Sequence, residues 1–155
     1  GLMSDTAIQG YIQTLLQAVT GFDDDDVTLG DPRVIDAGSP PYAIIWPGTI
    51  FAAGRSGDWS QVQVTWRHAV HVIERLLDDD YSDFCTYRQA AIDAIGANPT
   101  LGGNSEIVDT LVVEASLEFV RPRDASPDAP AQFVMSDLTV QTTERITYDG
   151  SGEFS

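Results

Sequence analysis

The chain has 155 residues, with 24 acidic and 8 basic side chains, so its formal net charge is −16. This length predicts one compact domain over residues 1–149, with a short polar tail at residues 150–155. The acidity argues against a protein that grips nucleic acid, because phosphate binding relies on clustered lysine and arginine. No apolar run is long enough to span a membrane, and no secretory leader is predicted. A single cysteine, Cys85, excludes an intramolecular disulfide and a cysteine-based zinc site, so a cytosolic context is the simplest interpretation.

The acidic excess has three interpretations. All eight basic residues are arginine, and aspartate outnumbers glutamate by 18 to 6. A GC-rich genome or adaptation to high salt would explain this bias without any function. The third interpretation is a surface that must repel a polyanion, and composition alone does not choose among them.

The N-terminal part predicts a helix followed by short strands. Ser4 is a favourable N-cap, apolar residues recur every three or four positions after it, and Gly21 supplies a left-handed stop. Short extended pieces are predicted at residues 27–29 and 33–36. Residues 42–46 are predicted to form a buried strand, because they are apolar and are bounded by prolines on both sides.

The middle of the chain is more ambiguous. The glycine-rich residues 48–58 are expected to form a long exposed loop or an open hairpin. Residues 61–77 show apolar side chains in strict alternation as far as Val72, which is typical of a strand, but they also carry one helical apolar stripe. The β-favouring residue types in this alternation favour the strand, while a helix over residues 66–77 stays open.

The C-terminal half predicts one helix and two long strands. The helix begins at Ser82 as its N-cap and ends at Gly96. Residues 107–119 alternate, with the apolar odd positions expected on the buried face. The last strand, residues 132–148, changes its apolar parity near residues 136–137, which predicts a bulge. The order α-β-β-β-α-β-β predicts an α+β fold with two helices packed on a mainly antiparallel sheet.

No residue pattern in the chain recommends an active site. A strand over residues 61–77 places His68 and His71 on opposite faces, so they cannot bind one metal ion; only a helix would align them with Glu74. The aspartate runs lack the spacing of a calcium loop, and neither a phosphate loop nor a nucleophile elbow is present. Cys85 is expected to be a small buried hydrophobe. We therefore predict a non-enzyme without a cofactor or a metal.

The three tryptophans are the largest candidate anchors. Trp46 and Trp66 fall in predicted strands and are expected in the core. Trp59 follows the glycine-rich stretch, where a core position and a contact surface are about equally compatible with the sequence.

One combination of elements resembles a known family. The amphipathic strand at residues 61–72 is followed by the helix YRQAAIDAI at residues 87–95, which runs into NPTLGG at residues 98–103, and two long strands complete the chain. In this order of elements the chain resembles the tail terminator (tail completion or neck) proteins of long-tailed phages and related tail-like particles. The resemblance implies a virion protein of the tail or neck, assembled in the host cytoplasm, that forms a hexameric ring. Its implied partners are further copies of itself, the tail tube protein and the head–tail connector, with no membrane involved.

The resemblance also assigns roles to charged and aromatic residues. DNA would pass through such a ring without specific binding, because acidic loops at the lumen repel phosphates. The residues expected to face the lumen are Asp23, Asp24, Asp25, Asp26, Asp78, Asp79 and Asp80. The residues expected at subunit contacts are Trp59, Arg55, Arg121 and Arg123. Two alternatives stay open: a small-molecule or partner-binding module, and a metal-dependent enzyme.

Overall fold

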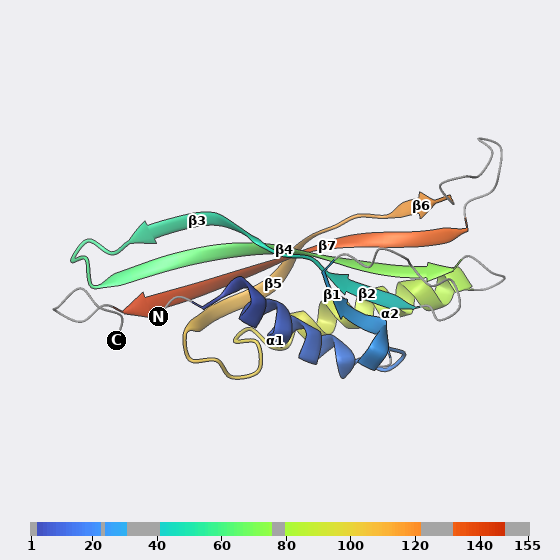
Figure 1. Ribbon diagram of the computed structural model, residues 1–155, viewed down its shortest axis with the longest axis horizontal. Helices are drawn as coiled ribbons and strands as arrows, with labels where there is room; N and C mark the ends of the chain where they lie inside the picture. The colour runs from blue at the N-terminus through green and yellow to red at the C-terminus, as the bar shows by residue number, and fades with distance from the viewer. Residues whose placement is uncertain (1–2, 23, 31–40, 76–79, 122–131, 148–155) are drawn as a thin grey trace.

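Two helices lie on one face of a seven-stranded sheet, and Figure 1 shows both helices beneath the strands. The computed structural model describes residues 3–22, 24–30, 41–75, 80–121 and 132–147. One strand pair is parallel and the others are antiparallel. The predicted α+β fold class and the mainly antiparallel sheet are therefore confirmed.

The elements follow the predicted order, with two additional short strands. They are α1 (Asp5–Gln17), the short 3-10 helix η1 (Asp24–Asp26), β1 (Val27–Leu29), β2 (Tyr42–Ile45), β3 (Thr49–Arg55), β4 (Gln61–Arg75), α2 (Asp80–Gly96), β5 (Ile107–Ala115), β6 (Glu118–Val120) and β7 (Phe133–Thr147). The glycine-rich stretch thus takes the hairpin alternative, with β3 paired to β4. The extended piece predicted at residues 33–36 lies outside the described residues.

The pair β4 and β7 forms the centre of the sheet. These strands run antiparallel in continuous register over 15 residues each, from Gln61 opposite Thr147 to Arg75 opposite Phe133. The other edge of β4 is shared by β2 and β3, and the other edge of β7 by β5 and β6. Because short strands follow one another along a long central pair, the molecule is elongated (Figure 1).

The strand alternative for residues 61–77 is confirmed as far as Arg75. The alternation predicts the strand correctly, because the even positions of β4 lie on the sheet face that α1 and α2 cover. The even positions of β7 lie on the same face. Trp66 is buried there as expected, whereas Trp46, directly after β2, is only half-buried. The largest fully buried apolar side chains are Phe84, Ile8, Ile12, Leu16, Ile45, Ile95, Leu138, Val27, Val70 and Val72.

The helix boundaries agree with the sequence at one helix and differ at the other. Ser4 caps α1, and its hydroxyl accepts a hydrogen bond from the Ala7 N–H at 3.1 Å. The predicted N-cap Ser82 is wrong, because α2 begins two residues earlier at Asp80 and Ser82 lies in its first turn. Acidic residues are favourable in the first turn of a helix, so the aspartates before Ser82 do not stop it.

The predicted bulge in the last strand is wrong. The even residues of β7 are buried along its length, and its register with β4 shows no shift. Ser136 occupies one of these buried positions and donates a hydrogen bond to the Ser116 carbonyl. Because Ser136 is polar, the run of apolar even positions is interrupted there in the sequence, which suggests a bulge although the even positions stay on the buried face.

The buried face of residues 107–119 is also the opposite of the predicted one. Leu111 is 39% and Phe119 54% exposed, whereas Thr110 is buried. Thr110 pairs with the buried Thr142 of β7, so Leu111 pairs with Gln141 on the other face. The register with β7 therefore overrides the apolar alternation. β5 contains two register shifts, and the predicted strand is interrupted at residues 116–117, between β5 and β6.

Candidate functional site

The sheet face opposite the helices carries exposed aromatic and aliphatic side chains beside an arginine. The Nε of Arg67 donates to the Oε1 of Gln141 at 3.2 Å, and the Arg67 guanidinium lies 3.5 Å from the centroid of the Phe51 ring. Leu111 pairs with Gln141 and extends this row across β5. Phe51, Leu111 and an arginine on one face form a surface typical of protein contacts rather than of catalysis.

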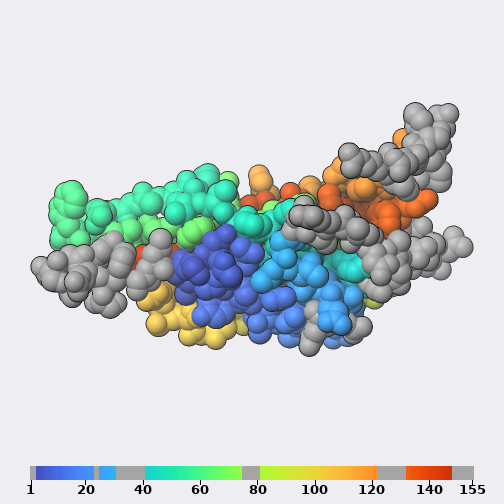
Figure 2. Space-filling view, viewed as in Figure 1, coloured from blue at the N-terminus to red at the C-terminus, as the bar shows by residue number. Residues whose placement is uncertain are grey.

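At one end of the sheet the strand ends extend past the helices in Figure 1, while Val64 and Glu144, nearer the centre, are buried; we call this end the arm. It consists of β3, residues 61–67 of β4 and residues 141–147 of β7. All seven residues of β3 are exposed, and Figure 2 shows this strand along the upper left edge of the molecule with no helix over it. A strand without a buried face gains little from packing in the isolated chain.

The arm ends in a tight turn over residues 56–60, which we call the tip. Asp58 Oδ1 accepts hydrogen bonds from the Ser56 hydroxyl at 2.7 Å, the Ser60 hydroxyl at 2.7 Å and the Ser60 N–H at 3.0 Å. These bonds, led by that from Ser56, lower the pKa of Asp58 to about 2. The Ser56 hydroxyl also accepts from the Gln61 N–H at 3.1 Å, which joins the tip to β4.

Trp59 stands on this tip. It is 70% exposed and its φ is 64°, in the left-handed region that side-chain-bearing residues rarely adopt. Its N–H donates to the Ser56 carbonyl at 3.1 Å, and the Arg55 guanidinium lies 5.9 Å from its ring centroid. Of the two alternatives for Trp59, the core position is therefore wrong; its role in a subunit contact stays a prediction.

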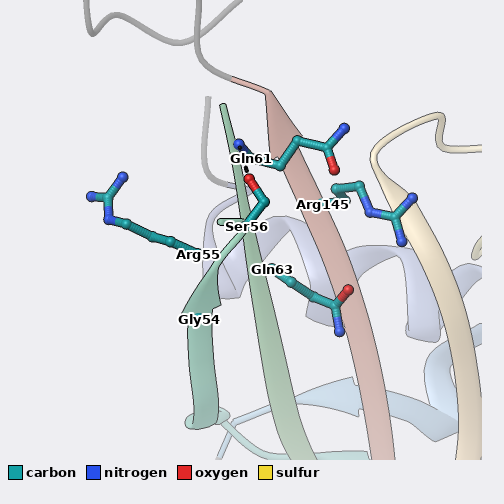
Figure 3. Close-up of a pocket in the computed structure, with 6 residues that line it drawn as sticks. All are labelled: Gly54, Arg55, Ser56, Gln61, Gln63 and Arg145. Atoms are coloured by element: carbon teal, nitrogen blue, oxygen red, sulfur yellow. Dashed lines mark hydrogen bonds between the residues drawn. The ribbon is translucent and has the colours of Figure 1, made fainter. Parts of the chain in front are cut away.

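An open pocket of about 330 Å³ lies on the arm (Figure 3). Its lining residues are Gly54, Arg55, Ser56, Gln61, Gln63 and Arg145. Figure 3 shows Gln63 and Arg145 side by side on neighbouring strands, while Arg55 points away from them. The lining thus combines two arginines with uncharged polar side chains.

The histidines do not form a metal site. β4 places His68 on the helix face and His71 on the other, where the Trp46 Nε1–H donates to His71 Nδ1 at 3.0 Å. No group of three or more His, Cys, Asp or Glu residues within the described part of the chain is arranged to hold a metal ion. The His–His–Glu triad that a helix would have created is therefore absent.

His68 is instead a buried residue that is hydrogen-bonded to Asp5. Its ring is inaccessible to solvent, and Nε2 lies 2.6 Å from Asp5 Oδ1, which also accepts the Gly48 N–H at 2.9 Å. Burial lowers the pKa of His68, and the contact with Asp5 offsets only part of this. Burial alone would raise the pKa of Asp5, but the hydrogen bonds from Gly48 and His68 outweigh it and lower this pKa. We therefore assign a neutral His68 that donates from Nε2 to the Asp5 carboxylate.

This environment predicts a loss of stability in acid. Since the pKa of His68 is lower in the folded chain, the unfolded chain takes up more protons below about pH 6.5. The His68 contribution is therefore complete above that pH and is lost as the pH falls through the folded-state value. Urea unfolding at pH 7 and pH 5 should show a smaller pH-dependent difference for His68→Gln than for the wild type. Equal pH dependence of the two proteins would contradict the assignment.

Gly48 is predicted to be irreplaceable next to His68. A Cβ at this position would lie 2.4 Å from His68 Nε2, whereas a Cβ at Gly54 meets nothing within 4 Å. We expect Gly48→Ala to lower the free energy of unfolding by about 1–3 kcal/mol, the usual cost of overpacking a filled site. Gly54→Ala is the matched control in the same hairpin, and thermal unfolding compares the two. Similar melting temperatures for both variants would show that His68 moves aside without cost.

A second buried polar group ties the N-terminal segment to the arm. The Glu144 side chain is inaccessible to solvent. Its Oε1 accepts a hydrogen bond from the Trp66 Nε1–H at 2.9 Å, and its Oε2 accepts one from the Met3 N–H at 3.1 Å. Glu144 lies on β7 next to Val64 of β4. The sequence alternation marks this position as buried but gives no sign of its partners.

The residues expected at the lumen are only partly described. Asp23, Asp78 and Asp79 lie outside the described residues, and the side chains of Asp24 and Asp80 are not described. Asp25 is exposed and Asp26 half-buried in η1. The two aspartate runs belong to different connections, and their place in a lumen stays a prediction.

One of the two remaining predicted contact residues lies at the far end of the sheet. Arg121 is exposed directly after β6, and Arg123 lies outside the described residues. The structure thus places Trp59 and Arg55 together on the tip, and Arg121 on another part of the sheet. The sequence analysis missed Asp58, Phe51 and Arg67; of these, only Asp58 has a local signal, since serines stand two positions on each side of it.

The prediction for Cys85 is wrong, because its side chain is exposed. It lines a shallow, wide-open depression of about 480 Å³ on the outer face of α2, with Thr86, Gln89, Ala90 and Asp93. Cys85 lies one position after the buried Phe84, which turns it away from the core. We call this surface the α2 groove.

Comparisons with known proteins agree with this fold. The chain matches one chain of a solved structure, the virion of a native gene transfer agent (GTA) particle, with a TM-score of 0.61. The match covers 89% of this chain and 94% of the other, at 16% sequence identity. The two chains share a fold. No family model and no curated protein matches this sequence, and no helix in the described ranges is long and apolar enough to cross a membrane.

Proposed function

We propose that this chain is a non-enzymatic structural subunit of a phage-like virion. The observation that carries the proposal is the fold shared with a GTA virion chain over nearly the full length of both. The absence of a metal-binding cluster among the described residues is compatible with a structural role.

Within such a particle, we propose the role of a tail terminator. Six copies would form a ring that caps the tail tube and joins it to the head–tail connector. The order of elements supports this role, as does the exposed arm, because a ring subunit needs two different surfaces that meet on neighbouring copies. A net charge of −16 per chain would let DNA pass such a ring without adhering to it.

The solution mass of the purified chain tests the ring. Six chains of 16.8 kDa give a closed hexamer of 100.8 kDa. We expect this species in light scattering, with a larger share at high salt, because salt screens repulsion between acidic subunits.

A tube-capping experiment complements the mass measurement. We expect the chain to bind the ends of tail tubes purified from its own particle, as seen by electron microscopy of negatively stained tubes. A chain that stays monomeric at every salt concentration and leaves tube ends bare would contradict the terminator role.

A further inference from the structure

The tip is constructed to hold one aromatic side chain in solvent. A left-handed backbone at a residue such as Trp59 costs about 1–3 kcal/mol and persists only where its surroundings fix it. Here the surroundings are the three hydrogen bonds to Asp58 and the bond from Trp59 N–H to Ser56. A side chain fixed before binding loses little entropy when a partner covers it. Tryptophan and arginine are also the residue types most enriched in interface hot spots.

The charge of the arm points to the chemistry of its partner. The arm with its tip carries Arg55, Arg67 and Arg145 against two acidic residues, of which Glu144 is buried. The rest of the chain holds 22 acidic residues and only five arginines. The arm with its tip therefore carries a net charge of +1, with the exposed Asp109 of β5 beside Thr143, while the rest of the chain is strongly acidic. A second copy of the chain offers acidic surface to Arg55 and Arg67.

The α2 groove provides a receiving surface of the right chemistry. The groove combines the Cys85 sulfur and the Ala90 methyl group with a carboxylate, Asp93, which accepts a hydrogen bond from Gln89 Nε2 at 2.8 Å. Asp83 is exposed on the same helix. Such a surface suits an indole ring with a guanidinium beside it.

The arm and the α2 groove lie apart on the molecule. In Figure 1 the arm forms the left end, while α2 lies beneath the right half of the sheet. A contact between them must join two copies head to tail, and a heterologous contact of this kind closes into a ring when its rotation allows.

We propose that the tip docks into the α2 groove of a second copy, with Trp59 in the groove and Arg55 beside Asp93. This inference rests on the proposed ring function and names the contact that builds the ring. The proposed contact is formed by two copies of this chain alone, without a bound ligand or metal.

Disulfide trapping tests this contact, since Cys85 is the single cysteine of the chain and lines the groove. Gly57→Cys adds a thiol at the tip, where a Cβ meets nothing within 4 Å and φ lies outside the left-handed region. Oxidation with diamide should link the introduced thiol of one copy to Cys85 of the next only when the two lie close, since a disulfide needs Cα atoms within about 7 Å. We expect a ladder of covalent multimers in steps of 16.8 kDa on non-reducing gels.

Three controls separate docking from random collision. Ser105→Cys places an exposed thiol on the loop before β5 and should give no ladder above background. In the Gly57→Cys background, Trp59→Ala should weaken association roughly 30-fold, as for a hot-spot residue. Arg55→Glu should also suppress the ladder, and adding Asp93→Arg should restore it, because each contact then carries the exchanged charges.

The outcomes distinguish the contact from the ring. A closed hexamer in solution with no ladder from Gly57→Cys would overturn the docking and leave the proposed function intact. A ladder that grows into open chains without a closed species would support the docking and contradict the ring. The absence of a ladder in concentrated protein that also stays monomeric would overturn the docking.

Discussion

Phe84→Ala is expected to lower the free energy of unfolding by about 3–5 kcal/mol, because it removes a ring that is wholly enclosed between helix and sheet. Phe84 is the largest fully buried side chain, and α2 carries it against the core. A domain of this kind has only about 5–15 kcal/mol of total stability, so the variant should unfold at much lower urea concentration. Circular dichroism during urea titration measures the difference.

Phe84→Leu serves as the milder companion of that variant. It retains most of the apolar volume, so its loss of stability should be clearly smaller than that of the alanine variant. If the alanine variant does not fold, the leucine variant still tests the position. A loss below about 1 kcal/mol for Phe84→Ala would contradict the close packing of this site.

Glu144→Ala is expected to cost about 2–5 kcal/mol. The substitution leaves the Trp66 Nε1–H and the Met3 N–H without their acceptors, and each buried unpaired donor costs about 1–3 kcal/mol. It also opens a cavity where a wholly enclosed side chain stood. Thermal unfolding followed by tryptophan fluorescence reports both the stability and the surroundings of Trp66.

Glu144→Gln is the matched control, since its amide oxygen accepts the Trp66 hydrogen bond and its volume is nearly the same. The amide NH₂ cannot accept the Met3 N–H, so we expect the glutamine variant to lose that bond but to keep the wild-type fluorescence maximum and more stability than the alanine variant. Equal destabilisation by alanine and glutamine would show that the second carboxylate oxygen and its charge, rather than the Trp66 hydrogen bond, hold the N-terminal segment on the sheet. The two variants thus also test how firmly the arm is joined to the helical layer.

Sequence signals predicted the structure correctly where residues close in the sequence determine it. Ser4 caps α1 because its side chain reaches a backbone N–H three residues on. The alternation in β4 predicted both the strand and the separation of His68 from His71, because side-chain direction in a strand depends on position alone.

The same signals failed where pairing with a strand far away in the sequence determines which side chains are buried. Leu111 and Val113 of β5 are exposed because the pairing of Thr110 with Thr142 sets the face, and neither segment alone reveals that register. Ser136 misled the prediction of a bulge in the same way, since its buried hydroxyl finds an acceptor 20 residues away.

The candidate site shows the same division. The sequence by itself determined that the chain is acidic, lacks a recognisable catalytic motif and carries Trp59 and Arg55 close together. Only the tertiary structure decided that Trp59 stands on a rigid tip, that Arg67 and Arg145 join one arm, and that Cys85 faces solvent. Composition and spacing act along the chain, whereas a surface exists only after pairing of β4 with β3 and β7 has brought separated segments to one place.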